Sequence, residues 1–133
     1  MLRAVLDTNV LVSAVISDGK PRLLLRKGIE KKFSLVTSDL ILKELASVLR
    51  RPKFKTSEDE IQQIVLALIQ SAEVVDVKSS FKVVKRDPND DAVFNTAYDG
   101  KADVIVTGDR DLLELESFKG VRVVSVSDAL GLV

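Results

Sequence analysis

Four acidic residues occupy positions from which their carboxylates could hold a divalent metal ion. Asp7 ends one run of apolar and β-branched residues, Asp109 follows another, Asp91 begins a helical pattern, and Glu44 lies inside one. Converging carboxylates repel and raise one another's pKa, so a divalent cation would make such a cluster stable. A bound cation could polarise a phosphate and acidify a water, and two cations could clamp both oxygens of a phosphodiester displacement.

The composition narrows the chemistry to oxygen ligands. The 133 residues include no histidine and no cysteine. Ser-His-Asp triads, cysteine nucleophiles, thiolate metal sites and disulfides are therefore excluded. Any metal must be bound by oxygen, which favours Mg²⁺, Mn²⁺ or Ca²⁺ over Zn²⁺.

Short β-branched runs alternate with helical patterns along the whole chain. Strands are predicted over 2–7, 34–37, 73–77, 104–107 and 121–126. Helices are predicted over 9–16, 21–31, 38–49, 57–72, 91–98, 110–115 and 127–130. The alternation predicts one α/β domain over 1–133, with a mainly parallel sheet between helices. Such sheets bind ligands beyond the carboxyl ends of their strands, where the strand order reverses.

Three of the acids are placed at that edge by the predicted elements. Asp7 and Asp109 follow strands, and the helix that Asp91 begins precedes the fourth strand, so its first turn faces the same edge. Helix capping and the helix dipole are an alternative explanation for each acid taken alone. Asp90 is interpreted as the N-cap of its helix, with a substitute role at the site left open.

Glu44 favours the metal interpretation because capping does not explain a mid-helix acid. It lies among Ile41, Leu45 and Val48, on the apolar stripe of its helix. An inward carboxylate is costly unless it is paired or hydrogen-bonded. A structural salt bridge, or a position at the margin of the stripe that reaches water, remains the alternative.

Other polar residues flank the acids and could support them. Thr8, Asn9 and Thr107 could orient carboxylates or the attacking water, and Asp111 could share the site. Their alternative roles are ordinary ones at helix starts and in a strand.

Charge is unevenly distributed although the formal net charge is zero. Residues 20–55 are rich in Lys and Arg, whereas residues 87–116 are rich in Asp and Glu. Solvated helix faces would explain this, and so would a basic rim that holds a polyanion beside an acidic pit. The candidate RNA-binding residues are Lys20, Arg22, Arg26, Arg50, Arg51 and Lys53. Aromatic residues are few, so phosphate contacts with steep salt dependence are expected rather than base stacking.

The acidic motifs together resemble those of the PIN-domain family over nearly the whole chain. The matching segments are Val5-Leu6-Asp7-Thr8-Asn9, Ser38 to Leu45, Asp87-Pro88-Asn89-Asp90-Asp91, and Thr107-Gly108-Asp109-Arg110-Asp111-Leu112. The resemblance implies a three-layer α/β/α sandwich and Mg²⁺- or Mn²⁺-dependent cleavage of RNA. It assigns the metal and catalytic roles to Asp7, Glu44, Asp91 and Asp109, and supporting roles to Asn9 and Thr107.

The last two motifs look most like the prokaryotic toxins of type II toxin–antitoxin pairs. This likeness implies a homodimer and an antitoxin protein that covers the active-site groove. No apolar run is long enough to span a membrane, and Asp7 comes too early for a signal peptide. A cytoplasmic location is therefore expected.

Two other functions stay open. A metal-dependent phosphatase or phosphotransferase could use a similar sheet, but Asn9 stands where a haloacid-dehalogenase-type site has its second Asp, and there is no Gly-rich phosphate loop. A non-catalytic RNA-binding module could keep the acids as caps only, and Glu44 on its apolar stripe argues against that.

Overall fold

A six-stranded sheet forms the centre of the computed structural model, which describes residues 1–83 and 88–133. The strands are β1 (Arg3–Leu6), β2 (Ser34–Ser38), β3 (Glu73–Val75), β4 (Val104–Val106), β5 (Ser117–Phe118) and β6 (Val121–Val124). Their order is β3-β2-β1-β4-β6-β5, and every neighbouring pair is parallel except β5 and β6. The chain moves outward from β1 in both directions, so the order reverses between β1 and β4.

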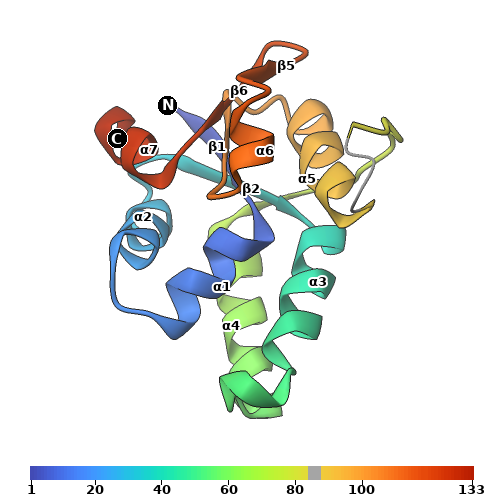
Figure 1. Ribbon diagram of the computed structural model, residues 1–133. Coiled ribbons are helices and arrows are strands. Elements are labelled where there is room, and N and C mark those ends of the chain that lie inside the picture. The colour runs from blue at the N-terminus through green and yellow to red at the C-terminus, as the bar shows by residue number, and fades with distance from the viewer. Residues whose placement is uncertain (84–87) are drawn as a thin grey trace.

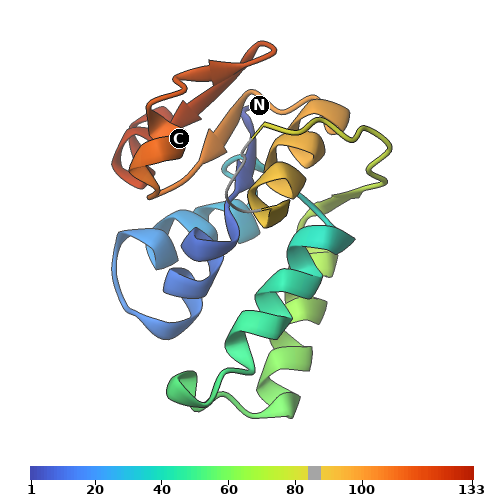
Figure 2. The ribbon, with the colours of Figure 1, turned by 45° about the vertical axis from the view of Figure 1, so that its right-hand side comes forward.

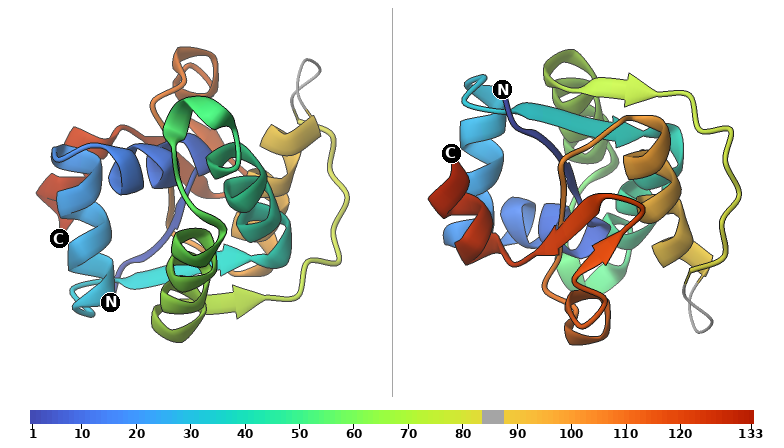
Figure 3. Two further views of the ribbon diagram at one scale, coloured as in Figure 1. Left: turned by 90° about the horizontal axis from the view of Figure 1, so that it is seen from below. Right: turned by 90° about the horizontal axis from the view of Figure 1, so that it is seen from above.

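Helices cover both faces of this sheet. They are α1 (Thr8–Ile16), α2 (Lys20–Ile29), α3 (Asp39–Leu49), α4 (Glu58–Ser71), α5 (Pro88–Asp99), α6 (Arg110–Leu113) and α7 (Val126–Leu132), with a 3₁₀ turn η1 (Pro52–Phe54). Figure 1 shows α5 on one side of the strands and α2 with α7 on the other, and Figure 3 shows the same layers from below and above. The predicted three-layer α/β/α architecture is confirmed. In residues 1–83 and 88–133, no helix has both the length and the apolar character needed to cross a membrane.

The central strands are apolar on both faces because both faces are covered. Val5 in β1, Val36 in β2 and Ile105 in β4 are fully buried. This explains why these strands read as continuous apolar runs rather than as alternating ones. Phe33, Phe94 and Leu45 are equally buried and join the strands to the helical layers.

Several element boundaries differ from the sequence-based expectation for local reasons. Helix α4 begins with a capping box, in which Ser57 Oγ accepts from the Glu60 amide and Glu60 Oε1 accepts from the Ser57 amide. The interpretation of Asp90 as an N-cap is wrong, because α5 already begins at Pro88, a residue suited to a first turn. The β5–β6 hairpin was not predicted because β5 has two residues and no apolar periodicity.

Gly100 ends α5 through close packing rather than through a left-handed conformation. The left-handed residue is Lys101, with a φ of 52°. A Cβ atom on Gly100 would lie 2.8 Å from Val36 Cγ1 and 2.9 Å from both Val75 Cγ2 and the Thr96 carbonyl oxygen. The glycine therefore lets the end of α5 approach β2 and β3.

We expect Gly100→Ala to lower the free energy of unfolding by about 1–3 kcal/mol, because the added methyl overpacks a site whose neighbours include backbone. Urea denaturation followed by circular dichroism measures it. The matched control is Gly131→Ala in α7, where a Cβ meets nothing within 4 Å. That change should be neutral or stabilising by up to about 1 kcal/mol. Equal stability of the two variants would contradict the packing explanation.

Candidate metal centre

Asp7 is a buried carboxylate at the point where the strand order reverses. It directly follows β1, is 3% exposed, and its backbone N–H donates to the Val106 carbonyl at 2.9 Å. The Thr107 hydroxyl donates to Asp7 Oδ2 at 2.8 Å. Asp7 occupies the N-cap position of α1, yet within the described part of the chain its side chain makes no capping hydrogen bond. No regular capping hydrogen bond therefore holds this carboxylate, although the amides of Thr8 and Asn9 in the first turn of α1 favour its charge.

The surroundings of Asp7 disfavour its negative charge. Burial is the main cause that raises the pKa of its carboxyl above the ordinary value, and the negative charge of Asp109 raises it further. The Thr107 hydroxyl and the nearby amides of Thr8 and Asn9 act in the opposite direction without cancelling the effect. A cation at this position would remove both unfavourable contributions.

Asp109 combines a capping role with a place beside Asp7. It is the N-cap of α6, and its Oδ1 accepts from the Asp111 amide at 2.8 Å. Its own backbone N–H donates to Thr107 Oγ1 at 3.1 Å. The Thr107 hydroxyl thus joins the two acids, as its predicted supporting role requires. Asp111 is exposed.

Glu44 lies on the buried side of α3, as its sequence neighbours indicated. It is half-buried, whereas Ile41 and Leu45 around it are fully buried. Thr8 Oγ1 donates to Glu44 Oε2 at 3.3 Å. Since Thr8 directly follows Asp7, this contact places the Glu44 carboxylate at the same edge of the sheet.

Asp91 lies in the first turns of α5, where its carboxylate holds an irregular segment of the chain. Its Oδ1 accepts from the Val83 amide at 2.8 Å. Asn95, one turn later, donates to the Asp91 carbonyl at 2.9 Å and to the Phe81 carbonyl at 3.0 Å. Asp87, the first residue of the motif that contains Asp91, lies outside the described residues.

The acidic residues are of the right chemical type to bind a cation through oxygen, but their carboxylates do not surround one position closely. Among residues 1–83 and 88–133, no three carboxylates meet closely enough to form an ion cage. Asp7 and Asp109 form the central pair and Glu44 joins them through Thr8, whereas the Asp91 carboxylate on α5 accepts a hydrogen bond from the Val83 amide. These donors suit a hard cation such as Mg²⁺ or Mn²⁺.

A groove of about 370 Å³ opens beside the central pair. Its lining residues are Asn9, Val10, Ser13, Pro21, Gly108, Asp109 and Val126. Asn9, predicted as a supporting residue, is therefore within reach of anything bound there. Substrate access to the acids is accordingly expected from this side.

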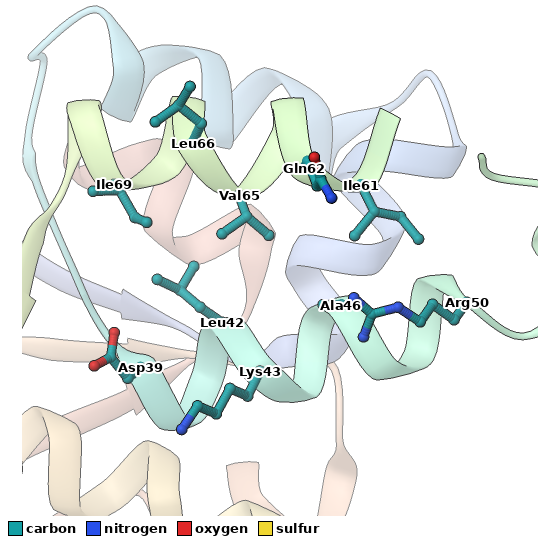
Figure 4. Close-up of a pocket in the computed structure, with 10 residues that line it drawn as sticks. All are labelled: Asp39, Leu42, Lys43, Ala46, Arg50, Ile61, Gln62, Val65, Leu66 and Ile69. Carbon is teal, nitrogen blue, oxygen red and sulfur yellow. The ribbon is translucent and has the colours of Figure 1, made fainter. Parts of the chain in front are cut away.

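A larger groove of about 510 Å³ lies elsewhere, between α3 and α4. Figure 4 shows Leu42, Val65 and Ile69 pointing into the space between the two helices. None of the four candidate acids lines it. Its lining is mainly apolar with Lys43 and Arg50 among it, and because it holds no candidate metal ligand its greater size does not make it the reaction site.

Some of the candidate RNA-binding residues already contact other groups of the protein. Arg22 donates to the Ala14 and Val15 carbonyls at 2.9 and 2.8 Å, so it caps the C-terminus of α1. Arg50 forms an ion pair with Glu58 at 2.8 Å, and Lys20 donates to Ser127 at 3.1 Å. The exposed residues Arg26, Arg51 and Lys53 complete the set.

The sequence-based reasoning missed one polar contact near the acids. Ser38 Oγ and Thr96 Oγ1 lie 2.8 Å apart in the interior, between the start of α3 and the middle of α5. The available signal was the one used for Glu44, a polar residue on an apolar face. Thr96 is three residues after Val93 and adjoins Ala97, and both of these are buried.

Comparisons with known proteins identify the family. The PIN domain profile matches residues 3–111. An uncharacterized protein of Methanocaldococcus jannaschii is 36% identical over 118 residues, which span 86% of this chain and 75% of that protein. The fold is also similar to VapBC2 from Rickettsia felis, solved bound to a DNA fragment from the VapBC2 promoter. That match has a TM-score of 0.63 and 15% identity, over 93% of this chain and 98% of the other. The profile match, which covers most of the chain, places this chain in the PIN domain family.

Proposed function

We propose that this chain is a metal-dependent endoribonuclease that hydrolyses RNA phosphodiester bonds with Mg²⁺ or Mn²⁺. PIN domains are in general nucleases. The observation that carries the proposal is the buried Asp7 carboxylate beside Asp109, where the strand order reverses. A carboxylate whose charge is disfavoured by burial and by a second acid is a strong candidate for a cation ligand.

Asp7, Glu44, Asp91 and Asp109 are the proposed ligands. A bound divalent ion would supply a Lewis acid for the phosphate and would acidify a water near neutral pH. Thr107 holds the Asp7 carboxylate in orientation, and Thr8 does the same for Glu44. Such supporting hydroxyls keep ligands in place without touching the substrate. Asn9 and Asp109 line the groove that would admit the phosphodiester.

RNA is the proposed polyanion, and basic side chains beside the groove and on the α3–α4 turn would bind its phosphates. Figure 2 shows α3 and α4 projecting as a hairpin away from the sheet. The turn between these helices carries Arg51 and Lys53, both exposed. Lys20 begins α2 next to Pro21 of the groove. Arg22 is left out of this surface because its guanidinium caps α1.

The biological role we propose is that of a toxin in a type II toxin–antitoxin pair, with a homodimer and an antitoxin partner. The motif resemblance supports this role, as does the fold shared with VapBC2. Co-expression with the product of an adjacent gene, followed by purification, tests whether such a partner exists. Growth arrest by this chain alone, relieved by that product, is the expected result.

The central prediction concerns cleavage of a labelled single-stranded RNA. We expect cleavage with Mn²⁺ or Mg²⁺, none in EDTA, and a loss of roughly 10³-fold or more in Asp7→Asn, because a charged ligand is removed. The matched control is Asp59→Asn, an exposed acid in the first turn of α4, which should cut like the wild type. Equal cleavage by Asp7→Asn and wild type would refute the assignment. Turnover of p-nitrophenyl phosphate without RNA cleavage would favour the phosphatase.

A second prediction follows from the raised pKa of Asp7. Because the folded protein holds this proton more tightly than the unfolded chain does, Asp7 makes metal-free stability fall as pH rises from 3.8 through the raised pKa. In EDTA at neutral pH, Asp7→Asn should therefore unfold a few degrees above the wild type. The difference should shrink as the pH falls towards 3.8.

Added Mn²⁺ should raise the melting temperature of the wild type more than that of Asp7→Asn, since ligand binding stabilises the folded state. Scanning calorimetry between about pH 4 and pH 7 measures both effects. A wild type that melts above Asp7→Asn at every pH in EDTA would show that burial does not disfavour the Asp7 charge.

A third prediction tests the basic hairpin turn. In an Asp7→Asn background, Arg51→Glu should weaken binding of single-stranded RNA and lower the slope of log K against log salt by about 0.7. The control is Lys101→Glu, an exposed residue that precedes β4 at the opposite edge of the sheet. Fluorescence anisotropy over a salt series provides the measurement. If the two variants bind equally well, the hairpin turn does not contact RNA.

A further inference from the structure

A buried pair of hydroxyl groups joins two of the helices that carry the candidate acids. Ser38 Oγ and Thr96 Oγ1 are 2.8 Å apart, and the two residues are 1% and 0% exposed. Ser38 is the N-cap of α3, and Thr96 lies in the middle of α5. Neither side chain can reach solvent, an ion or a substrate directly.

The direction of the hydrogen bond follows from its neighbours. Thr96 Oγ1 donates its single proton to the Ala92 carbonyl at 2.7 Å. Ser38 must then be the donor to Thr96, and Ser38 Oγ in turn accepts from the Ile41 amide at 3.4 Å. A directed series of hydrogen bonds therefore runs from the first turn of α3 to the first turns of α5.

Each end of this series lies on a helix that carries a proposed ligand. Ala92 directly follows Asp91, and the capped helix α3 carries Glu44. Equivalent hydroxyl contacts hold the other acids, with Thr107 on Asp7 and Thr8 on Glu44. The Ser38–Thr96 pair likewise connects two elements that carry candidate acids, namely α3 with Glu44 and α5 with Asp91.

We propose that Thr96 is a positioning residue, whose hydrogen bond with Ser38 fixes α5 against α3 and so sets Asp91 relative to Glu44. This inference rests on the proposed function, since it assumes that both acids bind one metal site. Packing alone does not explain the residue type, because valine would fill the same volume without needing a partner for a buried hydroxyl. The hydrogen bond is directional, so it restricts the orientation of α5 relative to α3 more than apolar packing does.

The test is a Mn²⁺ binding isotherm, in which electron paramagnetic resonance measures the free ion. Thr96→Val removes the hydroxyl at nearly constant shape, and we expect about tenfold weaker Mn²⁺ binding, as for other groups that orient metal ligands. Thr96→Ser keeps the hydroxyl and should bind nearly as the wild type does. Ser57→Ala removes the N-cap of α4, away from the acids, and controls for general destabilisation.

A double variant separates positioning from the cost of an unpaired buried group. Thr96→Val leaves the Ser38 proton without its acceptor. Ser38→Ala with Thr96→Val removes both partners and should recover the stability that the unpaired Ser38 hydroxyl costs, less the loss of the α3 N-cap, which Ser38→Ala alone measures. Low Mn²⁺ affinity that persists in the double variant supports positioning. Affinity that recovers together with stability overturns it, as does wild-type affinity in Thr96→Val.

The wild-type isotherm separates the two proposals. Wild-type binding of Mn²⁺ with no change in Thr96→Val would overturn the positioning role alone. A wild type that binds no Mn²⁺ would overturn the metal site of the proposed function, and the positioning role with it. Should Thr96→Val not fold, the double variant gives the same comparison.

Discussion

Burial of one carboxylate at the centre of the sheet edge is the constraint on which the rest of the site depends. Asp7 follows the strand from which the sheet grows in both directions, so strands and helices surround it. A buried charge is costly unless it is paired or hydrogen-bonded. Here Thr107 donates one hydrogen bond, while Asp109 adds an unfavourable charge. The fold thus keeps the ionised Asp7 carboxylate in surroundings that disfavour its negative charge, and a bound cation would offset that cost.

Hydroxyl groups hold the elements around this edge together. Thr107 contacts Asp7 and the Asp109 amide, Thr8 contacts Glu44, and Ser38 contacts Thr96. A neutral hydroxyl suits this task because it donates and accepts without adding charge to an acidic region. A lysine or arginine in its place would neutralise the acids and compete with a metal ion.

A capping role and the proposed ligand role are compatible for the acids of this molecule. Asp109 caps α6 with one carboxylate oxygen and still lies close enough to Asp7 to raise the pKa of that residue. Asp7 occupies a cap position without a capping bond in the described chain. The acids are at strand ends and helix starts because the open edge of a parallel sheet is built from those turns. Turns from neighbouring strands into helices favour acidic N-cap residues, and they also bring those acidic residues close to one another.

The order of elements and the acidic residues could be predicted from the sequence, because both depend on local patterns. Apolar runs marked the buried strands, and Glu44 on an apolar stripe marked an inward carboxylate. Local patterns do not reveal features that non-local packing decides. Gly100 is required by its close contacts with β2 and β3, and the two-residue strand β5 has no periodicity of its own.

The composition and spacing by themselves determined that any metal site must use oxygen ligands, and they predicted its place at the carboxyl edge of a parallel α/β sheet. Only the tertiary structure decided which groups hold each acid. The Thr107–Asp7 contact spans 100 residues of sequence, and the Ser38–Thr96 contact spans 58. Arg22, predicted from the sequence to bind RNA, likewise donates to the Ala14 and Val15 carbonyls at the end of α1. Such pairings depend on strand order and helix packing, which join distant residues through contacts that no local periodicity encodes.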